Sequence, residues 1–496
     1  EEDPEAAVKA LNTCYTYLGN MDEQLYCEAM TDNAYTKQPN DFTQNIGNGS
    51  YSTADSYVKQ VWDGRYTGIR MCNQLLENID RVPDLDPELK KRYIGEAKVL
   101  RAYSYYELYT KFGDIPYTTK VLSIKESMSI ARTAKATVIA NVLADLDEVI
   151  NGNYLPTSYD ADNKGRITRW AAMAIKAKIY LFEGNWTQVK NITSTIMTEG
   201  GFKLFGSYAG LFEIANEYNS EVILDAQYRP TSREHQMMYV FLPPTLGGYS
   251  QLSPLQELVD SYIMLDGKTI KETGTSFDES HPYANRDPRL KATVMYTGNS
   301  YTLADGTEVV INCEKGEGKD GYGVGSDCSA TGYYIKKYWD NTYRATLYSG
   351  LNPILIRYAD ILLMNAEALA ELGELDKTAW DATIKPIRDR AGFTLASALE
   401  FPEGASKDKL IEIVRNERRS ELALEGHRHK DIIRWRIADN VLNGWCHGLK
   451  TNDVVGTDDG YVRVENRTFN ANKHYLWPIP QAERDLNGNL EQNPNW

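Results

Sequence analysis

The stretch RYADILLMNAEALAELGELDKTAWDATIKPIRDRAGF, residues 357–393, decides the fold. Gly373 divides it into two helical segments, because glycine readily takes the left-handed conformation that is common at helix C-termini, and the second helix is predicted to begin near Asp376. The first segment carries apolar residues at the spacing by which an amphipathic helix faces a core: Tyr358, Leu362, Ala366 and Leu369. The stretch therefore predicts a helical hairpin.

The same punctuation, a helix followed by glycine, a polar residue and a large apolar one, occurs twice more, at Gly113-Asp114-Ile115 and at Gly184-Asn185-Trp186. Related hairpins of this kind are typical of degenerate tetratricopeptide repeats, which stack because no single helix pair can bury its apolar face. We therefore predict a mainly α-helical chain, 1–496, in one domain. Its predicted parts are a helical scaffold (1–199 and 353–437), an irregular insert with short β-strands (200–352) and a loop-rich C-terminal segment (438–496).

Charge and hydropathy exclude several classes of protein. The net charge is −15, which argues against a nucleic-acid surface and against a polybasic membrane patch. The sequence has no run of about 18 apolar residues that could cross a bilayer. The chain begins Glu1-Glu2-Asp3-Pro4, so we expect a processed or trimmed N-terminus. It has no Walker A loop and no other cofactor motif that its surroundings support, and no cofactor is predicted.

Six cysteines are spread along the chain without a C-x-x-C pair, which disfavours zinc or thioredoxin-like chemistry. Cys313 and Cys328 bracket a glycine-rich loop. The spacing is equally compatible with a disulfide that closes this loop and with two free thiols.

One pair of carboxylates deserves comparison with a glycosidase site. Glu417 and Glu421 share the inward face of a predicted helix. Glycoside cleavage requires carboxylates on opposite sides of the scissile bond, whereas residues at i and i+4 lie on the same side. We interpret them as part of a structural ion network, with three neighbouring arginines available to neutralise them: Arg415, Arg418 and Arg419. His427 and His429 face apart on a helix, so no metal site is predicted.

Tyrosine dominates the aromatic content, with 34 Tyr against 11 Phe and 9 Trp. Such rings suit the edges of a helical core or a half-wet surface. Residues 31–53 lose helical periodicity and are rich in amides, glycine and aromatic rings. This composition suits either a carbohydrate-binding loop or a solvated connection.

Six stretches resemble the SusD/RagB family, the cell-surface nutrient-binding lipoproteins of Bacteroidetes. In the family's order they are EAKVLRAYSYYELYTKFGDIPY (96–117), GRITRWAAMAIKAKIYLFEGNW (165–186), NRDPRL (285–290), PILIRYADILLMNAEALAELG (353–373), IVRNERRSELALEGHRHKDIIRW (413–435) and YLWPIPQAERDLNGNLEQNPNW (475–496).

The resemblance implies a non-enzymatic receptor built on four tetratricopeptide-like hairpins, with loops that form a glycan-binding face. It further implies a lipid anchor on the extracellular face of the outer membrane. The implied partner is a TonB-dependent transporter of the SusC type, which the binding protein covers as a lid. The matching motifs are scaffold residues, so they do not identify the ligand.

We predict an aromatic platform for an oligosaccharide, because aromatic rings suit the C–H faces of pyranose rings. Its predicted members come from the first loop and from the insert: Tyr35, Phe42, Tyr51, Tyr283 and Trp339, with Asn40 and Asp41 as polar partners. Two alternatives stay open. One is a peptide-binding scaffold of the RagB type, and the weaker one is a glycoside hydrolase.

Overall fold

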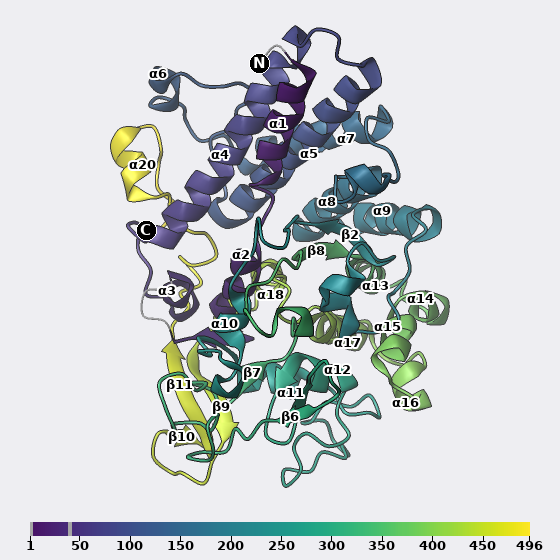
Figure 1. Ribbon diagram of the computed structural model, residues 1–496, viewed down its shortest axis with the longest axis vertical. Helices are drawn as coiled ribbons and strands as arrows, with labels where there is room; N and C mark the ends of the chain where they lie inside the picture. The colour runs from purple at the N-terminus through teal and green to yellow at the C-terminus, as the bar shows by residue number, and fades with distance from the viewer. Residues whose placement is uncertain (1–2, 38–41) are drawn as a thin grey trace.

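The computed structural model describes residues 3–37 and 42–496, and it is mainly helical with short β-strands (Figure 1), which confirms the predicted fold class. The longer helices of residues 4–151 fill the upper part of the view, while much of the insert and the C-terminal strands of residues 444–467 lie in the lower half. The helices are α1 (Pro4–Tyr15), α2 (Met21–Tyr26), α3 (Phe42–Asn48), α4 (Ser56–Asn78), α5 (Pro87–Phe112), α6 (Ile124–Ser127), α7 (Lys135–Asn151), α8 (Arg169–Phe182), α9 (Trp186–Glu199), α10 (Met237–Phe241), α11 (Gln256–Ser261), α12 (Pro288–Thr293), α13 (Tyr358–Leu372), α14 (Lys377–Ala382), α15 (Ile384–Ala391), α16 (Ala396–Leu399), α17 (Lys407–Glu421), α18 (Arg428–Arg434), α19 (Ala438–Val441) and α20 (Gln481–Leu486).

The strands are short and form several small antiparallel sheets. They are β1 (Ala34–Thr36), β2 (Val222–Asp225), β3 (Leu252–Pro254), β4 (Val294–Met295), β5 (Ser300–Thr302), β6 (Glu308–Val310), β7 (Tyr334–Ile335), β8 (Ile354–Arg357), β9 (Gly444–Lys450), β10 (Thr457–Asp458) and β11 (Tyr461–Arg467). β1 pairs with β3, β2 with β8, β4 with β7 and β5 with β6, while β10, β11 and β9 form one sheet in that order. The sequence did not predict this last sheet, because β9 has no clear alternation and the alternation in β11 is limited to Val462-Arg463-Val464-Glu465.

The long helices pack in chain order, α4 on α5, α5 on α7, α7 on α8, α8 on α9, α9 on α13 and α13 on α17. The insert therefore leaves this helical stack after α9 and returns to it at α13. Its buried aromatic residues, such as Phe241, Tyr262 and Tyr334, belong to a second core that also takes in Met21 and Leu25 of α2. Trp62, in contrast, is buried in the core of the helical stack.

The hairpin over 357–393 is present, but its first helix has no solvent-exposed face of the kind that an amphipathic helix has. Every residue from Ala359 to Ala370 is buried, because α13 lies between α9 and α17. Its polar side chains are paired rather than solvated. Asp360 accepts a 2.6 Å bond from Lys178, and Glu367 forms a 2.6 Å ion pair with Arg434. Gly373 ends the helix with a φ of 72°, and Asp376 caps the next one, as predicted.

Two predicted segments differ in detail. Within the helical scaffold predicted over 1–199, the chain breaks early: α1 ends at Tyr15, and α2 begins only after Asn20, whose side chain caps it. The hairpin predicted at Gly113 is interrupted, because residues 113–134 form a connection that contains α6 before α7 begins. Asn and Gly near the breaks end a helix more strongly than apolar spacing extends it.

All six cysteines are free thiols, and Cys313 and Cys328 are both buried. Of the two alternatives for this pair, the structure therefore shows the free form. Among the described residues, no helix is both long and apolar enough to cross a membrane.

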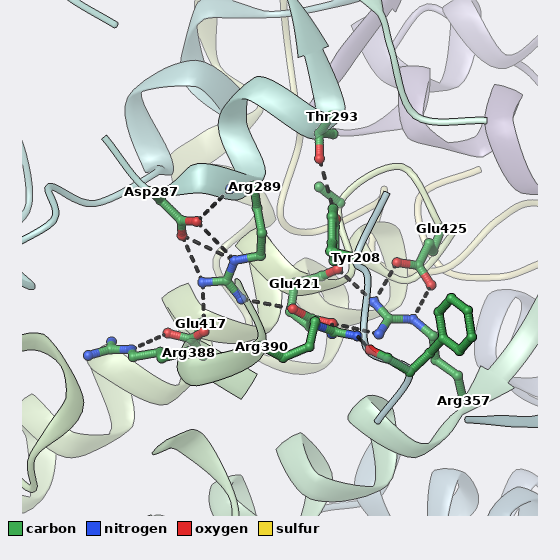
Figure 2. Close-up of polar contacts among 12 residues, drawn as sticks. Tyr208, Asp287, Arg289, Thr293, Arg357, Arg388, Arg390, Glu417, Glu421 and Glu425 are labelled. Atoms are coloured by element: carbon green, nitrogen blue, oxygen red, sulfur yellow. Dashed lines mark hydrogen bonds and ion pairs between the residues drawn. The ribbon is translucent and has the colours of Figure 1, made fainter. Parts of the chain in front are cut away.

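A buried ion network connects the insert to the helical stack (Figure 2). Arg357, 1% exposed, lies where β8 meets α13. Its guanidinium donates to Glu425 Oε2 at 2.7 Å, to Glu221 Oε1 at 2.7 Å and to Glu421 Oε1 at 2.6 Å. We call these four residues the Arg357 network. Arg390 also pairs with Glu421 and Glu221.

Glu417 and Glu421 are engaged in this region as ion-pair partners and not as an exposed acid/base pair. Arg289 lies 2.7 Å from Glu417 and 2.9 Å from Glu421, and Arg388 lies 2.7 Å from Glu417. The interpretation as a structural ion network is confirmed, but the expected partners were wrong. The three expected arginines bind other acids, since their helical positions point elsewhere: Arg415 binds Glu371, Arg418 binds Asp360 and Asp431, and Arg419 binds Asp32.

The arginines change the ionisation of the buried carboxyl groups. Burial by itself raises the pKa of Glu421, but the charges of Arg390, Arg357 and Arg289 outweigh it and hold this pKa well below the ordinary value. The pKa of Glu425 is lowered in the same way, by Arg357 and Lys337 against the effect of burial. Both groups are therefore charged when the protein is folded.

We expect Arg357→Met to lower the free energy of unfolding by about 3–5 kcal/mol, because it leaves buried carboxylates without their main counter-charge. Chemical denaturation followed by circular dichroism measures this loss. The matched control is Lys377→Met in the half-exposed Lys377–Asp381 pair, which we expect to change the free energy by less than about 1 kcal/mol. Equal losses in the two variants would contradict the role assigned to Arg357.

We also expect stability to fall in acid. A carboxyl group whose pKa is lower in the folded state than in the unfolded state stabilises the fold fully at pH values above its unfolded-state pKa, about 4.3 for glutamate. This stabilisation is lost as the pH falls through the folded-state pKa. The free energy of unfolding of the wild type should therefore drop between about pH 5 and pH 2. Arg357→Met should flatten this slope, and an unchanged slope in the variant would argue against the network as its source.

Candidate functional site

Three tyrosines of the insert form an exposed group that we call the tyrosine cluster: Tyr239, Tyr249 and Tyr348. The rings of Tyr239 and Tyr249 stack with centroids 5.7 Å apart and planes 14° apart. Tyr348 meets Tyr239 edge to face at 6.0 Å. Tyr249 is 46% exposed and Tyr348 is 40% exposed, while Tyr239 packs on the core of the insert. The cluster therefore presents aromatic surface to solvent on a supported base.

A tight turn brings Tyr249 next to Tyr239. The chain leaves α10, turns through Gly247 with a φ of 87°, and comes back so that Tyr249 N donates to Tyr239 O at 2.8 Å. At Gly248 a Cβ atom would lie 2.1 Å from the carbonyl oxygen of Leu242. Only glycine fits there, so the turn and the stacking of the two rings depend on it.

The position of Tyr348 is set by the backbone conformation of Leu347 and by a β-bridge at Ser349. Leu347 has a φ of 57°, an uncommon conformation for a branched residue, and its side chain is buried in the insert core. The next residue but one, Ser349, exchanges two 2.9 Å backbone hydrogen bonds with His235. His235 lies two residues before the start of α10. The segment that carries Tyr348 is therefore bonded to the segment that carries Tyr239.

His235 is a structural residue of this junction. Its Nε2 lies 3.2 Å from the carbonyl oxygen of Leu351, and burial lowers its pKa to about 4. The imidazole is neutral near pH 7 and acts there as a hydrogen-bond donor to the carbonyl.

The first loop lies next to the cluster. β1 pairs with β3, and Lys37 N donates to Gln251 O at 2.9 Å, two residues after Tyr249. Lys37 Nζ also donates to Cys328 O at 2.8 Å. The insert and the first loop, which were both expected to contribute to a binding face, therefore meet in space.

The residues predicted from the first loop have different surroundings. Tyr35 lies half-buried on β1, where its hydroxyl accepts a 3.4 Å hydrogen bond from Gln44. Tyr51 is only 4% exposed, because His474 and Trp496 pack on it with ring centroids at 5.2 and 4.7 Å. Its ring is part of the core and offers no free face to a ligand. Asn40 and Asp41 lie outside the described residues, and Phe42 begins α3 but its side chain is not described.

Tyr283 and Trp339, predicted from the insert, are half-buried and hold other parts of it together. Tyr283 stacks on Tyr296 with centroids 4.0 Å apart. Trp339 packs on Tyr301 at 5.1 Å, and its Nε1 donates to Thr302 O at 3.1 Å. Neither ring belongs to the tyrosine cluster.

None of the three members of the cluster was predicted from the sequence. The sequence does contain an indication that Tyr249 is exposed. Pro243-Pro244 and Gly247-Gly248 mark a turn, and Tyr249 is the first residue after it, where a side chain commonly lies at the surface. No comparable signal marks Tyr348, since its exposure depends on the left-handed conformation of Leu347.

The site suits recognition rather than catalysis. An exposed aromatic surface with hydroxyl groups at its edge can cover an apolar face and bond to a polar rim. Among the residues that the structure describes, no group of three His, Cys, Asp or Glu side chains could hold a metal ion. The carboxylates Glu417 and Glu421 are buried and paired.

Comparison with known proteins agrees with this architecture. The family model described as SusD family matches residues 211–496, and one described as starch-binding and associating with the outer membrane matches residues 7–181. The chain is 28% identical over 409 residues to SusD-like protein P25 of Formosa agariphila, covering 78% of this chain and 71% of that one.

Solved structures extend the likeness to the whole chain. A SusD-like carbohydrate binding protein of Bacteroides fragilis superposes with a TM-score of 0.87 at 28% identity, covering 99% of both chains. Surface glycan-binding protein A from Bacteroides fluxus gives a TM-score of 0.73 at 22% identity, again over 99% of both chains, which shows the shared fold.

The chain therefore belongs to the SusD family, the carbohydrate-binding proteins of the cell surface that associate with the outer membrane. Proteins of this family bind without catalysing a reaction, so the chain is not an enzyme.

Substitution of a buried tyrosine and of an exposed one should change the free energy of unfolding by different amounts. We expect Tyr51→Ala to lower the free energy of unfolding by about 3–5 kcal/mol, because it leaves a cavity beside Trp496. Tyr348→Ala should change it by less than about 1 kcal/mol, since the ring is 40% exposed. Denaturant titration of both variants makes the comparison, and a large loss for Tyr348→Ala would show that this ring is needed for folding.

Proposed function

We propose that this protein captures an oligosaccharide on the tyrosine cluster and delivers it to a TonB-dependent transporter of the SusC type. The single observation that carries the proposal is the stacked pair Tyr239 and Tyr249, of which Tyr249 is exposed, with the exposed ring of Tyr348 beside it. The C–H faces of a pyranose ring are apolar, and an aromatic face removes them from water at a gain of about 25 cal/mol per Å². The ring hydroxyls of the sugar remain free for polar partners.

The surroundings of the cluster support this ligand class. The cluster is supported by a bonded turn and by the His235–Ser349 bridge, so little conformational freedom is lost on binding. The described part of the first loop lies beside it, since Lys37 N donates to Gln251 O at 2.9 Å. The Bacteroides fragilis structure, similar over nearly the whole chain, is of a carbohydrate binding protein.

The delivery step and a lipid anchor on the extracellular face of the outer membrane are part of the same proposal. Membership of the SusD family supports both. In Figure 1 the long helices α1, α4, α5 and α7 lie at the opposite end of the molecule from much of the insert, which makes them a candidate docking face for the transporter.

A second candidate is peptide capture by the helical scaffold. A cleft of about 480 Å³ opens beside α2 and α4, and its walls include Tyr17, Tyr57 and an ion pair between Glu23 and Arg65. Ion pairs and tyrosines of this kind also suit an extended peptide. Peptide binding would be lost on changes at Arg65 and not on changes in the tyrosine cluster.

The test is calorimetric titration of the chain with a panel of neutral plant and host oligosaccharides and of oligopeptides. We expect saturable binding of one glycan class, with Tyr249→Ala/Tyr348→Ala weakening it about tenfold, which corresponds to ~1.4 kcal/mol. Tyr218→Ala is the matched control, because Tyr218 is 41% exposed and lies outside the cluster.

Two outcomes would contradict the proposal. One is an affinity for the glycan that the double variant leaves unchanged. The other is binding of peptides without binding of any saccharide, which would favour the helical cleft. Each glycan mixture is also analysed for newly formed reducing ends, whose release would revive the hydrolase alternative.

A further inference from the structure

A cavity of about 440 Å³ lies where the insert, the helical scaffold and the C-terminal sheet meet. α11 contributes Asp260, α17 contributes Asn416 and Arg419, and the start of β9 contributes Trp445. α11 packs on both β9 and α17, so the walls are held by three elements far apart in the sequence. Within the described part of the chain, no residue of the tyrosine cluster lines this cavity.

Trp445 gives the cavity an aromatic wall. Its side chain is 43% exposed, which is unusual for a residue of this size. The guanidinium of Arg463 lies over the ring, 5.5 Å from its centre, and Arg463 Nε is in turn held by Asp458 at 3.0 Å. This contact supports the indole from one side. Trp445 also lines the cavity, so part of its surface can contact a ligand there.

Polar groups converge on the same space. Asn416 and Asp260 are each half-buried and anchored, because Asn416 Nδ2 donates to Ser261 O at 3.0 Å and Asp260 accepts from Gln256 at 2.7 Å. Asn440, which also lines the cavity, is exposed. Amide and carboxylate groups in fixed positions are suited to hydroxyl groups as donors and acceptors.

The charges around the cavity balance. Three acidic side chains (Asp32, Glu257, Asp260) and three basic ones (Lys271, Arg419, Arg467) line it. Several are already paired with each other or with neighbours: Asp32 with Arg419 at 3.0 Å, Glu257 with His447 at 2.7 Å and Arg467 with Glu465 at 3.0 Å. An added ion would meet no excess of opposite charge, whereas a neutral polyhydroxyl ligand meets an aromatic face and fixed polar groups.

We propose that this cavity is a second carbohydrate site, which holds a neutral sugar unit against Trp445, separate from the tyrosine cluster. The proposal rests on the proposed function, since it assumes a glycan as ligand. A second site would let the protein hold a long or branched glycan at two points, and simultaneous engagement of both raises the overall affinity without new contacts at the first.

The test uses the full chain labelled with 5-fluorotryptophan, and the ¹⁹F resonance of Trp445 is assigned by its disappearance in Trp445→Phe. The chain also carries Tyr249→Ala/Tyr348→Ala, which disables the tyrosine cluster. Neutral disaccharides with different linkages are then titrated. We expect a saturable shift of the Trp445 resonance with at least one of them, while the resonance of Trp380, 1% exposed in the core, stays in place.

Calorimetry provides the second measurement. In an otherwise wild-type chain, Trp445→Ala should weaken binding at this site at least tenfold and reduce the stoichiometry for that disaccharide from two to one. Asn440→Ala, an exposed change on another part of the cavity wall, should weaken binding severalfold and guards against misfolding of the tryptophan variant.

The outcomes separate the two proposals. If no disaccharide moves the Trp445 resonance, while the wild-type chain still binds glycan, the second site is overturned and the proposed function stands. Failure of every saccharide to bind the wild type overturns both. A shift caused by oligopeptides but by no saccharide overturns the ligand class assigned to the cavity.

Discussion

The buried guanidinium of Arg357 is the constraint on which the rest of the structure depends. A charge removed from water must be paired, and here the partners come from separate places: Glu221 before β2, Glu421 at the end of α17 and Glu425 in the turn that follows. Satisfying all three fixes where the insert leaves and re-enters the helical stack. The same demand keeps the glutamates out of reach of any ligand, which agrees with a protein that binds without catalysis.

The binding surface is built on this base by local backbone conformation. Gly248 permits a turn that no other residue allows, and Leu347 is held in a left-handed conformation by its buried side chain. Each feature turns a tyrosine outward at the edge of a well-packed core. Rigid support for exposed rings lowers the entropy lost on binding, so loops on a scaffold of this kind suit recognition.

The abundance of tyrosine has two structural uses, and burial distinguishes them. Tyr51 lies in a loop whose composition suits ligand binding, yet Trp496, at the far end of the chain, packs on its ring and buries it. Tyr249 and Trp445 keep large exposed surfaces because their immediate neighbours, Tyr239 and Arg463, support one side of each ring. An aromatic residue becomes available to a glycan only where the fold supports it without enclosing it.

The helical class, the hairpins at Gly184 and Gly373 and the structural role of Glu417 and Glu421 followed from the sequence, because helix periodicity, glycine termination and i,i+4 geometry are local properties of the chain. The sequence could not show that α13 is buried on all sides or which arginines neutralise the glutamates. The exposure of individual rings was equally out of reach, as Tyr51 shows. These points depend on the tertiary structure, since burial and ion pairing involve segments tens to hundreds of residues apart, and no local pattern records which of them meet.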